Sequence, residues 1–132
     1  LTVTGTEGIQ MPNNFYIKYP NLREELNGEE RELMYDTKKG RTVIAKKIYG
    51  GKVIENVCQA LARIVIGEQL LRVAEKYKVV MTVHDAIGCI APLEEAEEAM
   101  RYVEKVMKIC PEWAQGLPLD CEGGYAKNYG GC

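Results

Sequence analysis

The residues best suited to chemistry lie together at one dipeptide, His84-Asp85, which follows a β-rich run and contains the only histidine of the chain. A carboxylate held at the tip of a rigid hairpin can bind Mg²⁺, because this ion takes oxygen ligands and usually engages one or two carboxylates together with substrate phosphates. Such a site suits phosphoryl transfer, in which two metal ions about 3.5 to 4 Å apart stabilise the attacking and leaving oxygens. By itself the dipeptide favours a simpler interpretation, a turn residue hydrogen-bonded to its neighbour.

Two β-rich runs flank the dipeptide and would position it. Residues 78–84 and 87–90 are rich in β-branched and other apolar side chains, and only Asp85-Ala86 separates them. This pattern predicts two strands joined at a tight turn. We therefore expect an antiparallel hairpin with Asp85 at or near its tip.

A long helix is predicted from Lys52 to about Tyr77, which at the standard rise per residue would be roughly 39 Å long. At 100° per residue, one broad side is mostly apolar, while a polar stripe falls on the other side within an arc of about 80°. The stripe consists of Asn56, Gln59, Arg63 and Gly67. Periodicity alone favours a solvated face, or hydrogen bonds and salt bridges inside the fold, over a ligand-binding face.

The remaining segments complete a prediction of an α+β fold, an antiparallel sheet backed by two helices. Pro92 suits the first residue of a second helix with an inward apolar stripe. The charged stretch 23–31 predicts a solvated loop or one helical turn. The tail after Cys110 predicts a loop followed by a last strand. We expect a strand-rich part, 1–48, and a second part, 49–132. Four short strands of one antiparallel meander are predicted in the first part: Leu1–Thr4, Phe15–Tyr19, Glu32–Tyr35 and Arg41–Ala45.

Composition limits the class of protein. The chain has 132 residues, of which 46% are hydrophobic and 27% charged, and its formal net charge is −2. The balance is that of one globular domain, and the whole-chain basic character of a dedicated nucleic-acid binder is missing. Five cysteines without a Cys-x-x-Cys pair predict reduced thiols. The chain has no run of about 18 apolar residues that could span a bilayer. We therefore expect a soluble, cytoplasmic protein without membrane partners. A start at Leu1 fits a fragment, a processed chain or removal of a leader.

Three segments stand out in their order and separation: Tyr49-Gly50-Gly51-Lys52-Val53-Ile54-Glu55-Asn56, Gln59-Ala60-Leu61-Ala62-Arg63 and Val83-His84-Asp85-Ala86-Ile87. They resemble the last third of family A DNA polymerases of the bacteriophage type, related to DNA polymerase I, whose Val-His-Asp hairpin is known as motif C. The ending, Trp113-Ala114-Gln115-Gly116-Leu117-Pro118-Leu119 with Glu122-Gly123, resembles that of phage members. The resemblance covers residues 45 to 132 and implies the C-terminal portion of the palm.

The resemblance implies roles for individual residues. Asp85 would bind the catalytic magnesium ions, and His84 would lie close to the primer terminus. Gln59 would contact the minor groove of newly formed base pairs, where every pair offers an acceptor that an amide can test without reading sequence. Arg63 would reach the same groove or a phosphate, and Asn56 is a weaker correspondence. The implied partners are primer–template DNA and a deoxynucleoside triphosphate.

The chain departs from the family pattern in two ways. Ala86 stands where many members have a glutamate in motif C. No segment of these 132 residues matches the motif A aspartate or the fingers helix, so we expect the isolated chain to be inactive in nucleotidyl transfer. The remaining polymerase domains, or a second chain, would have to supply them. Apolar surface left exposed by their absence would favour self-association.

Three alternatives stay open. The chain could be one subunit of a split polymerase, or a noncatalytic interaction domain that keeps the palm scaffold. It could also be a small metal-dependent hydrolase, which would need further carboxylates near Asp85. The sequence offers Asp120 and Glu122 as candidates for that role.

Overall fold

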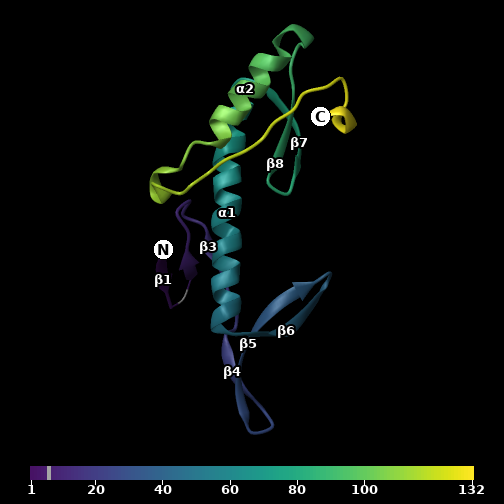
Figure 1. Cartoon of the computed structure of the whole chain (residues 1–132). Coiled ribbons are helices and arrows are strands. Elements are labelled where there is room, and N and C mark those ends of the chain that lie inside the picture. Colours follow the sequence, from purple (N-terminus) through teal and green to yellow (C-terminus); the bar gives the residue numbers. More distant parts are fainter. Residues whose placement is uncertain (6) are drawn as a thin grey trace. The chain divides into compact units, whose positions relative to one another are not determined.

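Helix α1 (Gly50–Ala74) contributes to both of the compact units into which the chain divides, residues Leu1–Leu61 and Ala62–Cys132. The structure is a computed structural model that describes residues 1–5 and 7–132, and Figure 1 shows the order of its elements. The helix was predicted from Lys52 to about Tyr77, but it begins two residues earlier and ends at Ala74. The backbone N–H groups of Lys76 and Tyr77 still bond to the Val73 carbonyl. The predicted helix end therefore included the turn that follows the last helical residue.

The first unit holds two three-stranded antiparallel sheets, and the prediction of a single meander was wrong. One sheet consists of β1 (Thr2–Thr4), β2 (Gly8–Gln10) and β3 (Tyr16–Ile17). Strand β2 had no counterpart among the predicted strands. It begins at Gly8, whose φ is +110°, and a Cβ there would lie 2.2 Å from the Ile17 carbonyl oxygen. Only glycine permits this close pairing of strands.

The second sheet consists of β4 (Arg23–Asn27), β5 (Glu30–Lys39) and β6 (Thr42–Ile48). The prediction of a loop or helical turn over 23–31 was wrong, because this stretch forms β4 and the start of β5. Opposite charges across the strands support the pairing: Arg31 lies 3.5 Å from Glu24, and the Arg23 guanidinium contacts Asp36 at 2.8 Å. Pairs of opposite charge across neighbouring strands stabilise the pairing of β4 with β5 even though few apolar side chains are buried there.

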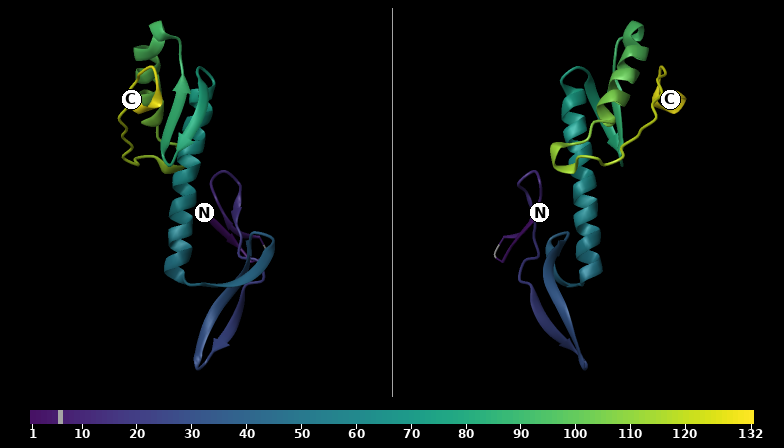
Figure 2. Two further views of the ribbon diagram at one scale, coloured as in Figure 1. Left: turned by 90° about the vertical axis from the view of Figure 1, so that its right-hand side faces the viewer. Right: turned by 60° about the vertical axis from the view of Figure 1, so that its left-hand side comes forward.

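The second unit packs the C-terminal part of α1 with the hairpin and helix α2 (Ala96–Met107), which the single-turn helix Leu93–Glu95 precedes. Strands β7 (Lys78–Val83) and β8 (Ala86–Ile90) pair antiparallel, with a bulge between Val79 and Met81. The two views of Figure 2 show the hairpin and α2 in this unit. Its buried apolar side chains are Ile64, Val65, Val73, Tyr77, Ala99 and Val106.

Two predictions in the C-terminal half needed correction. Pro92 precedes the single-turn helix, and α2 itself starts at Ala96. No strand follows β8 in the described residues, where a last strand was expected. The tail instead forms two short 3₁₀ turns, Glu112–Ala114 and Tyr129–Gly131. Prolines at 111 and 118 lack the N–H that a strand ladder requires.

The fold class is confirmed as α+β, with antiparallel sheets and two α-helices. The five cysteines are free thiols. Among the described helices none is long and apolar enough to cross a membrane.

A buried amide joins the two helices of the second unit. Gln69 is 4% exposed, and its side-chain nitrogen donates a 2.6 Å hydrogen bond to the Met107 carbonyl at the end of α2. Replacing Gln69 with leucine should lower the free energy of unfolding by about 2 kcal/mol, because it leaves that carbonyl without a donor. Urea unfolding followed by circular dichroism measures the change. The control Gln115→Leu removes an exposed glutamine whose amide donates a longer, 3.3 Å bond to the Pro111 carbonyl, and it should cost under about 0.5 kcal/mol because water can replace that donor. Equal losses would show that burial of the Gln69 bond contributes nothing.

Candidate functional site

The His84-Asp85 dipeptide forms the two-residue turn between β7 and β8, one residue earlier than the predicted Asp85-Ala86 connection, and Asp85 lies at the hairpin tip as expected. Val83 pairs with Ala86 across the hairpin, so only these two residues make the connection. Both side chains are exposed. The turn therefore holds the Asp85 carboxylate at the tip of two paired strands, open to a ligand.

The backbone of His84 is in the left-handed region, with φ of +54°. Histidine is enriched there relative to most residues, but a non-glycine residue in this conformation still costs on the order of 1 kcal/mol. Strained backbone of this kind is often found at functional sites. At this turn it sets the direction in which both the imidazole and the following carboxylate leave the hairpin.

This strain gives a test of the turn. His84→Gly should be more stable than His84→Ala by about 1 kcal/mol, because glycine adopts positive φ without a Cβ penalty. Both variants lose the imidazole, so their difference isolates the backbone effect. Thermal unfolding of the two chains measures it, and identical midpoints would show that residue 84 does not hold this conformation in solution.

The described residues hold no cluster of metal-ligating side chains at this turn. No group of three or more His, Cys, Asp or Glu side chains among them could hold a metal ion. Of the two carboxylates suggested as partners of Asp85, Asp120 forms an ion pair with Lys108 at 2.8 Å. That bond is the main cause that lowers the pKa of Asp120. Asp85 can therefore supply one oxygen ligand, and the others would have to come from outside these residues.

Two residues of the predicted stripe lie in the first unit, on the N-terminal part of α1. The Asn56 amide donates to the Tyr19 hydroxyl at 2.9 Å, a part-buried bond. The exposed Gln59 amide donates to Glu55 at 3.1 Å. Asn56 thus has a partner inside the fold, whereas the Gln59 amide lies at the surface and can exchange its contact for a ligand at little cost.

The other two stripe residues lie in the second unit. Arg63 is exposed and has no ion-pair partner among the residues that the structure describes. A Cβ added at Gly67 would meet nothing within 4 Å. Packing within the chain therefore does not explain a glycine that costs about 1 kcal/mol of helix propensity relative to alanine.

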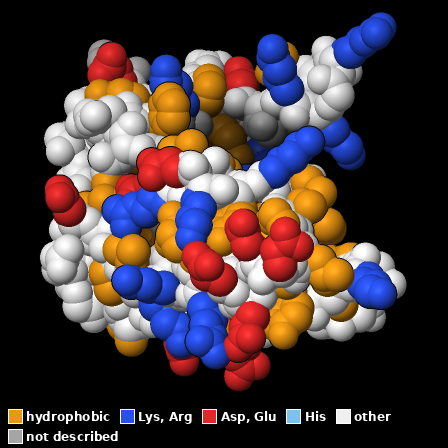
Figure 3. Space-filling model, turned by 90° about the horizontal axis from the view of Figure 1, so that it is seen from above, with side chains coloured by type: hydrophobic (Ala, Val, Ile, Leu, Met, Phe, Trp, Pro, Cys, Tyr) orange, Lys and Arg blue, Asp and Glu red, His pale blue; other side chains and the backbone are white. Residues whose placement is uncertain are grey.

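Large hydrophobic side chains are exposed in both units. Ile54 and Leu71 of α1 are 66% and 67% exposed, and Val80 of β7 is 49% exposed. Hydrophobic side chains accordingly lie among charged ones on the surface seen in Figure 3. Part of the apolar side of α1 is thus exposed, and the residues that α1 buries are Ile64, Val65, Gln69 and Val73.

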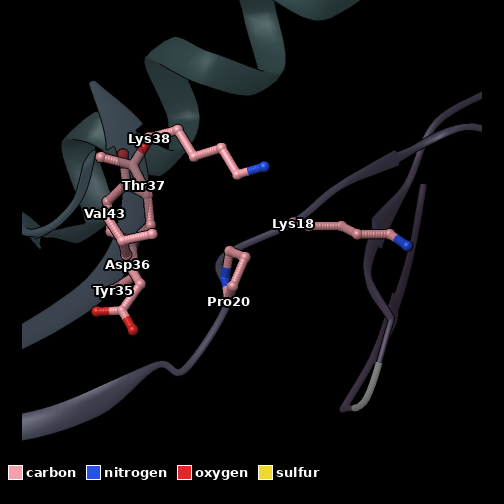
Figure 4. Close-up of a pocket in the computed structure, with 7 residues that line it drawn as sticks. All are labelled: Lys18, Pro20, Tyr35, Asp36, Thr37, Lys38 and Val43. Carbon is pink, nitrogen blue, oxygen red and sulfur yellow. The ribbon is translucent and has the colours of Figure 1, made fainter. Parts of the chain in front are cut away.

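Sequence reasoning missed a pocket of about 390 Å³ in the first unit (Figure 4). It lies against β5 and β6 and the segment that precedes β4. Its walls combine apolar, polar and charged side chains of both signs, namely Lys18, Pro20, Tyr35, Asp36, Thr37, Lys38 and Val43. The available signal was the basic run Lys38-Lys39-Gly40-Arg41 at a predicted turn.

Comparison with known proteins relates the chain to a DNA polymerase. Over 120 residues it is 32% identical to a protein of Bacillus phage SP02 described as a DNA polymerase, an alignment that covers 87% of this chain. The same alignment covers 18% of the phage protein, so the chain spans about a fifth of the length of this relative. No protein-family model matches the chain. No solved structure matches it either.

Proposed function

We propose that this chain is part of a family A, bacteriophage-type DNA polymerase, in which it forms the C-terminal part of the palm. The observation that carries the proposal is the similarity to a phage DNA polymerase along 87% of the chain. The hairpin with Asp85 at its turn supports it, because a motif C carboxylate must be held at such a tip. The reaction would be template-directed addition of a deoxynucleotide to a primer 3′ end. It would take place in the bacterial cytoplasm.

Asp85 would be one ligand of the catalytic magnesium in this assembly. Bound there, magnesium would stabilise the attacking and leaving oxygens of phosphoryl transfer. The chain's own contribution is to fix the carboxylate between two paired strands, which costs no reordering when substrate arrives. His84, adjacent in the same strained turn, would position the primer end. With a single carboxylate at this tip, the 132-residue chain alone is expected to show no primer extension.

The exposed side of α1 would face DNA. Among the residues that the structure describes, Gln59 has only the neighbouring Glu55 as a side-chain partner, so its amide can donate to minor-groove acceptors, which every base pair presents. Arg63 is an exposed cation one helical turn later. Gly67, one turn further, has open space where a side chain would be, which permits close approach of a DNA backbone. Asn56 bonds to Tyr19, and we propose that it supports the helix from within rather than touching DNA.

Removing the Gln59 amide should weaken binding of matched primer–template DNA. We expect Gln59→Ala to lower the affinity of the full product of the gene by about tenfold, the loss typical of one good base-edge contact. The change should leave thermal stability nearly unaltered, because the side chain is exposed. Fluorescence anisotropy with a labelled hairpin primer–template measures the affinity. Unchanged affinity would remove Gln59 from the interface, and Gln115→Ala, an exposed glutamine in the tail, is the control.

Primer extension by the full product of the gene that encodes these residues tests the proposed function. The reading frame upstream of Leu1 should encode a motif A aspartate and a fingers helix, and the product should incorporate deoxynucleotides. If that frame lacks both motifs but a copurifying chain supplies them, the polymerase is split. If neither source exists and no extension occurs, the proposal is wrong and the palm scaffold serves an interaction.

A further inference from the structure

We propose that the β5–β6 hairpin end and the pocket beside it bind the sugar–phosphate backbone of a single DNA strand. Five cations form this surface, which we call the basic hairpin. They are Lys38, Lys39, Arg41 and Lys46 of the β5–β6 hairpin, and Lys18 on the other wall of the pocket. The inference deepens the proposed function, on which it rests for the choice of DNA as the partner. It concerns a surface remote in sequence from the His84-Asp85 turn.

The first observation is that these cations are uncommitted. All five are exposed, and none has an ion-pair partner in the described part of the chain. Asp36, a carboxylate that lines the pocket two residues before Lys38, bonds to Asn21 at 3.0 Å and to Arg23 at 2.8 Å. Those bonds lower the pKa of Asp36. Its negative charge is thus engaged on the side of β4 and leaves the hairpin end positive.

The second observation is that charge is separated along one sheet. The hairpin between β4 and β5 carries the acidic residues Glu24, Glu25, Glu29, Glu30 and Glu32. Three cations at that end, Arg23, Arg31 and Lys47, are paired with these acids. At the other end no acid lies between Thr37 and Lys47, where four residues are basic. In a chain of net charge −2, a polyanion can gain attraction only at such a local patch.

The third observation is the shape of the surface. The pocket of about 390 Å³ is lined by Pro20, Tyr35 and Val43, by the cations Lys18 and Lys38, and by Thr37 and Asp36, whose carboxylate is paired with Arg23. Figure 4 shows the Lys38 side chain extending from β5 toward the segment that holds Pro20, whereas the Lys18 side chain points away from Lys38. Apolar walls with a cation beside them suit one nucleotide, whose sugar or base packs on the aromatic surface while the phosphate meets Lys38. A flat membrane surface would use the cations but not this hollow.

The test compares two triple variants of the full chain. One removes the hairpin charges, Lys38→Gln with Lys39→Gln and Arg41→Gln. The control, Lys78→Gln with Lys105→Gln and Lys127→Gln, makes the same change of net charge at exposed cations that also have no ion pair. Fluorescence anisotropy with a labelled single-stranded oligonucleotide is recorded between 50 and 200 mM salt. Circular dichroism of all three chains shows whether the exposed substitutions leave the fold intact.

We expect the unaltered chain and the control to bind, and the hairpin variant to lose most of its salt dependence. If three cations contact phosphates of a single strand, the affinity should fall about 20-fold between 50 and 200 mM salt. The hairpin variant lacks those three cations, so its affinity should no longer show that decrease. Equal salt slopes for all three chains would overturn the inference, as would hairpin-dependent binding to phosphatidylserine vesicles without binding to DNA. Either outcome leaves primer extension by the full gene product to decide the proposed function separately.

Discussion

Primer extension should fall at least about a thousandfold when Asp85 is replaced by asparagine in the full product of the gene. The change keeps the size of the side chain at an exposed turn between β7 and β8, so the fold should be unaffected. It removes the negative charge that would hold a catalytic magnesium ion, and loss of several kcal/mol of transition-state stabilisation corresponds to such a factor. Single-turnover incorporation of one deoxynucleotide measures the rate.

Asp120→Asn is the matched control, because it makes the same chemical change at a second exposed aspartate. Its partner is Lys108, at 2.8 Å, and an exposed pair of this kind contributes at most about 1 kcal/mol. We therefore expect its rate to stay within about threefold of the unaltered protein, since surface changes of this sort are small. Equal activity of the Asp85 variant would refute the metal-ligand role. Loss of activity in both variants would instead favour a hydrolase-like site that uses both carboxylates.

Truncating Val73 to alanine should have a large effect on stability. Val73 is fully buried, at 0% exposure, near the end of α1. The loss of two methyl groups and the cavity left behind should lower the free energy of unfolding by about 2 kcal/mol. For a unit of this size, that corresponds to a fall in melting temperature of roughly 10 °C. Thermal unfolding followed by circular dichroism checks it.

Val80→Ala is the control for this prediction, because Val80 lies in the same unit but is 49% exposed. It should cost well under about 1 kcal/mol, since little apolar area returns to water. Comparable losses at the two positions would mean that α1 does not bury Val73 in solution. The core of the second unit would then have to be assigned elsewhere.

The hairpin could be predicted because its signals are local. Two β-rich runs with only Asp85-Ala86 between them allow one tight connection, and the structure has the turn at His84 and Asp85. Helix α1 was predicted within three residues at each end for a similar reason, a periodic pattern over 25 residues. The candidate site residues also came from sequence, through the resemblance of three segments to those of family A DNA polymerases.

Other features could not be predicted because distant pairing decides them. Strand β4 contains Glu24 and Glu25, which favour a loop by composition, and it forms because β5 lies beside it with Arg31 in register opposite Leu26. Strand β2 depends on the pairing of Gly8 and Ile9 with neighbours up to eight residues away. The pocket beside Lys38 needs the segment of Lys18 and Pro20, about 20 residues earlier, to return to β5.

The sequence alone therefore determined the elements that local spacing controls: the long helix, the hairpin and the placement of Asp85 at its turn. Only the tertiary structure decided which polar groups are already engaged. It bonds Asn56 to Tyr19 and Asp36 to Arg23 while leaving Gln59 exposed and the basic hairpin without ion pairs. The physical reason is that hydrogen bonds and ion pairs depend on which side chains meet across the fold, and sequence spacing does not encode those distances.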